Sequence, residues 1–139
     1  MLTRRFITNC ALCSAIAGLV ATEAEAQTAG APAQTSGVTR TIMSRTELPG
    51  GTYATILVAA EIAPGATVAR HTHPGVESAY LLDGECELMV DGQPDRTLKA
   101  ADGFQIPPGM PHSLRNGPKA AKLAITYTVE KDKPLASPA

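Results

Sequence analysis

The stretch RHTHPGVESAY, residues 70–80, places two histidines one residue apart and a glutamate four residues after the second. The whole chain of 139 residues contains only three histidines, so one tripeptide holds two of them. Side chains at positions i and i+2 of a β-strand point to the same face of the strand. His71 and His73 are therefore predicted to project side by side, while Arg70 and Thr72 face the other way.

Glu77 follows a turn predicted by PGV, residues 74–76, and is expected to begin the next strand. Paired strands lie about 4.8 Å apart, so a hairpin here would bring Glu77 to the same pocket as the two histidines. Two imidazoles and a carboxylate form the facial arrangement that holds a divalent metal and leaves other coordination positions open. The alternative is a pair of solvent-facing histidines, which a His-x-His pattern alone does not exclude.

The third histidine, His112, ends the segment PPGMPH, residues 107–112. Prolines limit the backbone of this segment, and Gly109 permits a tight turn. A fourth ligand presented from here would complete a site of three histidines and one glutamate. All three histidines would then belong to one site, and the buried negative charge of Glu77 would be compensated by a bound cation. We therefore favour metal binding over an incidental histidine pair.

Outward from this site, short β-branched or alternating runs are separated by Gly, Pro and Asp turn residues. Turn signals recur every 8–12 residues or so without a useful helical stretch, which predicts a sandwich or barrel. Asp-Gly at 83–84 and at 91–92 is a strong hairpin signal. The continuously apolar run 52–63 predicts a strand buried on both faces. The strands expected are 38–48, 52–63, 66–73, 77–82, 85–90, 96–100, 104–106, 112–115 and a last long strand from Ala121.

The N-terminus is predicted to be a signal peptide over residues 1–26. Arg4 and Arg5 precede a short apolar run and an AEA cleavage site, which is the order found in export signals; a buried N-terminal helix is the alternative. The paired arginines suggest the twin-arginine route, and the mature protein is expected in the periplasm or outside the cell. Residues 27–37 are predicted to be a flexible linker, residues 38–130 the domain, and residues 131–139 a C-terminal tail.

Composition excludes several classes of protein. The formal net charge is −1, and the chain has no Trp, which argues against a nucleic-acid partner. The apolar run near the N-terminus is too short to span a bilayer. Cys10 and Cys13 lie in the predicted signal peptide, so Cys86 is the one cysteine of the mature chain and is expected to be a small buried hydrophobe.

The spacing of these residues resembles the two sequence motifs of the cupins. The second motif departs at its first glycine, where Ala101 stands, and Gly103 is expected to supply that turn instead. The resemblance covers about residues 40–130. The matching residues are Gly65, His71, His73, Glu77 and Gly84 in the first motif, and Pro107, Gly109, His112 and Asn116 in the second.

The resemblance implies an all-β fold, the double-stranded β-helix or jelly-roll barrel of the cupins. It also implies one divalent metal held by His71, His73, Glu77 and His112, and a homodimer. Imidazole with carboxylate admits Mn, Fe, Ni, Cu or Zn. Loading in the cytoplasm before export would favour Mn or Fe.

Relatives with this ligand set include dioxygenases, decarboxylases, isomerases, lyases and binding modules, so the family does not fix the reaction. We favour a small metalloenzyme acting on an oxygen-rich metabolite, with Glu77 either a ligand or, swung off the metal, a general base. A non-catalytic binding module is the alternative, and a purely structural metal is disfavoured because structural zinc sites are closed and rich in cysteine. Gln105, Tyr80 and Arg115 are candidate pocket-edge residues, although ordinary strand positions are preferred for all three.

Overall fold

The computed structural model describes residues 36–139. This part of the chain is all-β, as predicted, and within it no helix is long and apolar enough to cross a membrane. The predicted signal peptide and all but the last two residues of the predicted linker lie outside the described residues. The strands are β1 (Val38–Glu47), β2 (Tyr53–Ile62), β3 (Thr67–Thr72), β4 (Gly75–Asp83), β5 (Glu85–Val90), β6 (Arg96–Lys99), β7 (Gly103–Ile106), β8 (His112–Asn116), β9 (Ala121–Glu130) and β10 (Ser137–Pro138).

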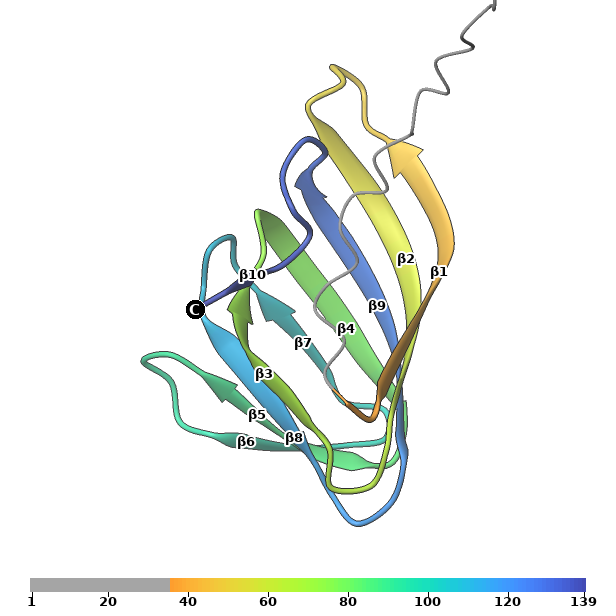
Figure 1. Ribbon diagram of the computed structural model, residues 1–139, viewed down its shortest axis with the longest axis vertical. Helices are drawn as coiled ribbons and strands as arrows, with labels where there is room; N and C mark the ends of the chain where they lie inside the picture. The colour runs from red at the N-terminus through yellow and green to blue at the C-terminus, as the bar shows by residue number, and fades with distance from the viewer. Residues whose placement is uncertain (1–35) are drawn as a thin grey trace, which may run out of the picture.

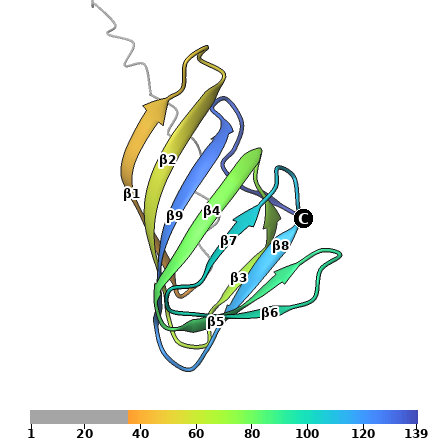
Figure 2. The same ribbon diagram turned by 180° about the vertical axis from the view of Figure 1, so that it is seen from behind.

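The strands form two antiparallel sheets of five, which lie face to face in the jelly-roll arrangement (Figures 1 and 2). The first sheet has the order β1-β2-β9-β4-β7, and the second has the order β10-β3-β8-β5-β6. Consecutive strands therefore often lie in different sheets. The core fills the space between the inner faces, where alternate residues of β2, β9 and β5 are buried.

Strand β2 corrects one expectation, because it is buried on one face and not on both. Ile56, Val58 and Ala60 point inward and are at most 4% exposed, whereas Leu57 on the outer face is 43% exposed. The run reads as continuously apolar because small alanines and one leucine occupy outer positions. Single exposed apolar side chains are common on protein surfaces, so this pattern does not require a second covering layer.

The connection from β3 to β4 corrects a second expectation. We predicted a hairpin there, but β3 pairs with β8 and β10, while β4 pairs with β9 and β7. Pro74 and Gly75 carry the chain across from one sheet to the other. Asp83-Gly84 likewise links strands of different sheets, and Asp91-Gly92 alone of the two dipeptides lies in the loop of a true hairpin, between β5 and β6.

The second cupin-like motif is built differently from our expectation at its start. Ala101 itself adopts the left-handed conformation with φ of 77°, the one non-glycine residue among 36–139 to do so. Gly103 does not supply that turn and instead begins β7. At the end of the motif, the Asn116 amide nitrogen lies 2.8–3.0 Å from the backbone oxygens of Ile62, Ala63 and Lys119. Asn116 thereby ties two neighbouring turns together.

The predicted C-terminal tail, residues 131–139, takes part in the fold. Its strand β10 pairs with the end of β3, with Ser137 opposite Thr72 and Pro138 opposite His71. Figure 1 shows this segment returning from β9 to the edge of the second sheet. Cys86 is buried as expected at 2% exposure, and burial followed by the charge of Glu85 raises the pKa of its thiol to about 11.

Candidate metal centre

The four predicted ligand residues meet between the two sheets. His71 on β3 lies opposite His112 at the start of β8, and His73 follows the end of β3. Glu77 is the third residue of β4 and reaches the same point from the other sheet. One ligand atom from each of these four residues lies within 4.8 Å of the others, so the cluster could hold a metal ion. His73, Glu77 and His112 are at most 5% exposed, and His71 is half-buried.

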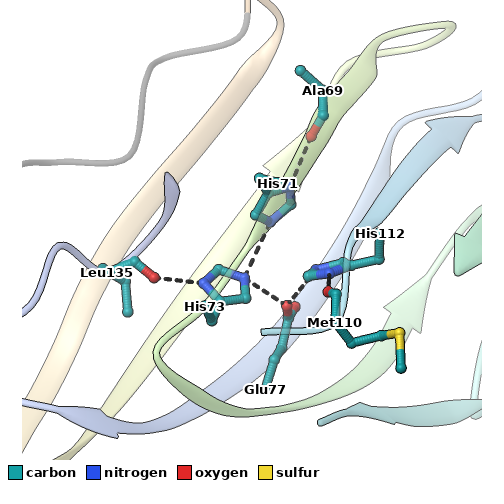
Figure 3. A network of polar contacts seen from close by, with 7 residues as sticks. All are labelled: Ala69, His71, His73, Glu77, Met110, His112 and Leu135. Carbon is teal, nitrogen blue, oxygen red and sulfur yellow. Dashed lines mark hydrogen bonds and ion pairs between the residues drawn. The ribbon is translucent and has the colours of Figure 1, made fainter. Parts of the chain in front are cut away.

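Each imidazole is oriented by a backbone carbonyl (Figure 3). His71 Nδ1 lies 2.7 Å from the oxygen of Ala69, and His112 Nδ1 lies 3.0 Å from the oxygen of Met110. His73 Nδ1 lies 2.6 Å from the oxygen of Leu135, in the C-terminal segment. A carbonyl oxygen can only accept, so all three Nδ1 atoms donate and all three Nε2 atoms are directed at the centre of the cluster.

The inner atoms of the cluster are all acceptors when the imidazoles are neutral. His71 Nε2 lies 3.1 Å from His73 Nε2, and Glu77 Oε2 lies 2.9 Å from His73 Nε2 and 3.0 Å from His112 Nε2. Lone pairs facing one another at such distances repel unless a positive charge lies among them. Either protons on the imidazoles or a cation meets that need, so this donor set fits a divalent metal.

The electrostatics of the site follow from burial and from these contacts. Burial alone would raise the pKa of Glu77, but hydrogen bonds from His112 and His73 outweigh it and lower the pKa to about 2. Burial opposes protonation of His112, yet the Glu77 carboxylate raises its pKa above 6.5. Burial dominates at His71, whose pKa falls to about 4 although the Ala69 carbonyl opposes the shift.

Chelator-treated protein should lose stability in acid through Glu77. The pKa of this carboxyl falls from 4.5 to about 2 on folding, so its contribution is present above pH 4.5 and is lost as the pH falls toward 2. Denaturant titrations at about pH 5 and about pH 3 should show a larger drop in unfolding free energy for the wild type than for Glu77→Gln. Glu77 also raises the pKa of His71 and of His112, so a carboxyl NMR titration of the wild type measures the state of Glu77 apart from the histidines. A Glu77 carboxyl that becomes protonated near its ordinary pKa of 4.5 would contradict its ionised, hydrogen-bonded state.

Three cavities adjoin the cluster. The largest, about 400 Å³, is bordered by His73, Pro74 and Gly109. A second has a volume of about 130 Å³ and is lined by Arg40 on β1, Tyr127 on β9, His71, His73 and residues of β10. The smallest, about 30 Å³, lies deeper and also has Arg40 and Tyr127 in its wall, together with Glu77 and His112. The Tyr127 ring packs on His73 with a centroid distance of 4.8 Å. A small molecule in the cavity of about 130 Å³ would therefore contact His71 and His73.

The three candidate pocket-edge residues, Gln105, Tyr80 and Arg115, are ordinary strand residues on outer surfaces, which is the alternative that we preferred. Gln105 is exposed and its side chain donates to Ser78, while Tyr80 is 46% exposed. Arg115 pairs with Glu87 on the exposed side of the second sheet. Arg70, predicted to face away from the histidines, is exposed and pairs with Asp91, and it also borders the cavity of about 130 Å³.

Three residues near the cluster escaped the sequence analysis: Leu135, Tyr127 and Arg40. Leu135 acts through its backbone oxygen, which leaves no trace in the sequence. Tyr127 lies in phase with the buried residues Leu123 and Ile125 of β9, and that period of two could have placed it inside. Arg40 shares the inward face of β1 with Val38, and a cation at such a position is a usable signal.

Comparison with known proteins gives the same family as the motifs. The sequence model of the cupin domain matches residues 58–127, half of the chain. The dimethylsulfoniopropionate (DMSP) lyase DddQ of Ruegeria pomeroyi is 40% identical over 45 residues, covering 32% of this chain and 22% of the lyase.

Solved structures share the fold at low identity. The DMSP lyase DddQ from Ruegeria pomeroyi has a TM-score of 0.60 at 21% identity, over 73% of this chain and 51% of the lyase. The chain thus spans about half the length of that relative. The polyketide cyclase RemF from Streptomyces resistomycificus has a TM-score of 0.60 at 20% identity, over 75% and 72% of the two chains. An uncharacterised protein with a double-stranded β-helix domain from Klebsiella pneumoniae has a TM-score of 0.58 at 21% identity, over 75% and 85%. Motifs, fold and family match agree, and the chain belongs to the cupin domain family.

Proposed function

We propose that this protein is an exported, metal-dependent cupin enzyme that acts on a small oxygen-rich metabolite. The observation that carries the proposal is the inward orientation of three Nε2 atoms and one carboxylate, each imidazole being held by a backbone carbonyl. Ligating histidines generally donate their second ring nitrogen in this way, which fixes the ring and raises its basicity as a ligand. A cavity beside the cluster gives a substrate access to it.

His71, His73, Glu77 and His112 would hold one divalent ion. The bound metal would supply Lewis-acid or redox chemistry to a substrate oxygen. Mn or Fe is favoured, and Zn, Ni and Cu are the alternatives that this donor set also accepts. The adjoining cavity distinguishes the site from a closed structural one.

Glu77 suits the role of a ligand better than that of a general base. A base works best when its pKa lies near the operating pH, whereas the pKa of Glu77 is about 2 in this arrangement. The same low pKa keeps the carboxylate ionised and available to a cation at neutral pH. We therefore propose Glu77 as a metal ligand. Where the reaction needs a general base, another group of the substrate-bound site would supply it.

The lyase class is the reaction type we favour. A curated relative that is 40% identical over 45 residues is a lyase. Dioxygenase, decarboxylase and isomerase chemistry would use the same ligands. The partner is a small molecule, with neither nucleic acid nor membrane involved in the mature form, and the homodimer expected from the family stays a prediction.

Elemental analysis of the protein purified from its native compartment tests the metal. We expect about one equivalent of Mn or Fe per chain at the four-ligand site, and a mass spectrum showing an N-terminus at Gln27. Protein stripped of metal should lose turnover and regain it with one particular ion. A ligand that binds without turnover under any of these metals, with O₂ supplied, would identify a non-catalytic binding module instead.

A further inference from the structure

The cavity beside the cluster has a charged wall that metal binding does not use. Arg40 on β1 lines both the cavity of about 130 Å³ and the deeper one of about 30 Å³. Tyr127 lines the same two cavities, and the positive charge of the Arg40 guanidinium acts on its hydroxyl. The two side chains thus present N–H and O–H donors to a space that His71 and His73 also border.

Arg40 differs from the arginines on the outer surfaces. It is half-buried, and among residues 36–139 no carboxylate lies within 4.0 Å of its guanidinium. Arg70 and Arg115, by contrast, each pair with an acidic side chain in solvent. A cation drawn partly out of water costs free energy unless an anion compensates it. The compensating anion is therefore expected to come from a ligand.

The charge of the loaded site points the same way. Glu77 contributes one negative charge and the neutral imidazoles contribute none, while a divalent ion and Arg40 together contribute three positive charges. The cavity would then carry an excess of positive charge in a space partly shielded from solvent. Such a space attracts an anionic ligand and disfavours a neutral one of the same shape.

We propose that Arg40 and Tyr127 form the anchoring site for the carboxylate of a small organic acid, which is the substrate class of this protein. The inference rests on the proposed function, because the anchored molecule would lie against the metal-binding histidines. A guanidinium matches a carboxylate with two parallel hydrogen bonds, and the tyrosine hydroxyl adds a third donor. Arg40 and Tyr127 determine specificity and orientation and do not ligate the metal.

The size of the cavity limits the acid. An apolar cavity of about 150 Å³ holds benzene, which has about six non-hydrogen atoms. At about 130 Å³, the cavity lined by Arg40 accepts a molecule of similar or slightly smaller size. Pro138 and Ala136 of the C-terminal segment border the cavity, which is partly open, so a larger acid would extend past that segment into solvent.

Isobutyrate and isobutyramide provide a matched test, since they have the same shape and differ in charge. Isothermal titration calorimetry of the metal-loaded protein should show at least about tenfold tighter binding of isobutyrate, the value of one charge-assisted contact of roughly 1.4 kcal/mol. Arg40→Gln should lower this preference by about tenfold, leaving the part that the net charge of the metal and Glu77 contributes, and Arg40→Lys should restore part of the loss. Arg45→Gln, on the exposed part of the same strand, is the control and should leave the preference unchanged.

Metal content, measured on the same samples, separates this inference from the proposed function. Arg40→Gln should retain as much metal as the wild type, because Arg40 is not a ligand. A preference for isobutyrate that is undiminished in folded Arg40→Gln, or a wild type that binds both probes equally or neither, overturns the anchoring site while the metal centre stands. A protein that binds no metal but still shows the Arg40-dependent preference supports the anchoring site and contradicts the proposal of a metal-dependent enzyme.

Discussion

Replacing His112 by alanine is expected to lower the metal content of the purified protein at least tenfold. Loss of a residue that only orients a ligand typically costs 10–100-fold in affinity, so loss of a ligand should cost at least about 100-fold. His112 is 4% exposed and its Nε2 lies 3.0 Å from Glu77, so no solvent-exposed side chain can readily take its place. Elemental analysis after dialysis against metal-free buffer measures the result.

The neighbouring variant Ser113→Ala is the control for His112→Ala. Ser113 lies on the same strand and on the opposite face, where its hydroxyl approaches the sulfur of Met89. Ser113→Ala should keep the metal of the wild type, and circular dichroism should show both variants folded. A folded His112→Ala protein with unchanged metal content would remove His112 from the metal centre.

The positions of the histidines could be predicted from local rules alone. A period of two along a strand places His71 and His73 on one face, and a Pro- and Gly-rich turn fixes the start of β8 at His112. Neither inference needs to know which strands are neighbours. The register then confirms the convergence, because His71 lies directly opposite His112.

The route of Glu77 to the cluster could not be predicted in the same way. A turn such as PGV is equally compatible with a hairpin and with a corner that carries the chain to a second sheet. The choice depends on which long-range partner each strand finds, and here β3 pairs with β8 while β4 pairs with β9. The carboxylate therefore faces the histidines across the core and does not lie beside them in one sheet. The hairpin signal at Asp83-Gly84 was wrong for the same reason, because turn residues fix the local backbone and not which strands pair.

The features that complete the site are tertiary in origin. The oxygen of Leu135 orients His73 from 62 residues away, and any residue could supply a backbone oxygen. The segment 131–139 looks like a tail because it is short, polar and rich in proline, yet it pairs with β3 at the site. Arg40 and Tyr127 come from β1 and β9 of one sheet, and they border the same cavity only because β2 pairs with both of these strands.

Gly75→Ala is expected to destabilise the fold by about 3 kcal/mol, which corresponds to a melting temperature lower by roughly 10–15 °C for a domain of this size. A Cβ at Gly75 would lie 2.1 Å from the backbone oxygen of Thr128 and 2.6 Å from the Cα of Val129. Gly75 pairs with Val129 in the register of β4 and β9, so the clash is with backbone of the central strands and cannot be relieved by a rotamer change.

Gly103→Ala is the matched control. Gly103 begins β7, the neighbour of β4, as Gly75 begins β4, and neither glycine has a left-handed φ. The Cβ added at Gly103 would come no closer than 3.3 Å to the oxygen of Ala79, which should cost about 1 kcal/mol or less. Thermal melts of chelator-treated protein measure both variants without a contribution from bound metal. Similar melting temperatures for the two would mean that β4 and β9 can separate at Gly75 at little cost. The close approach of these strands fixes where Glu77 emerges two residues later, so a stable Gly75→Ala protein with full metal content would also show that the cluster does not depend on it.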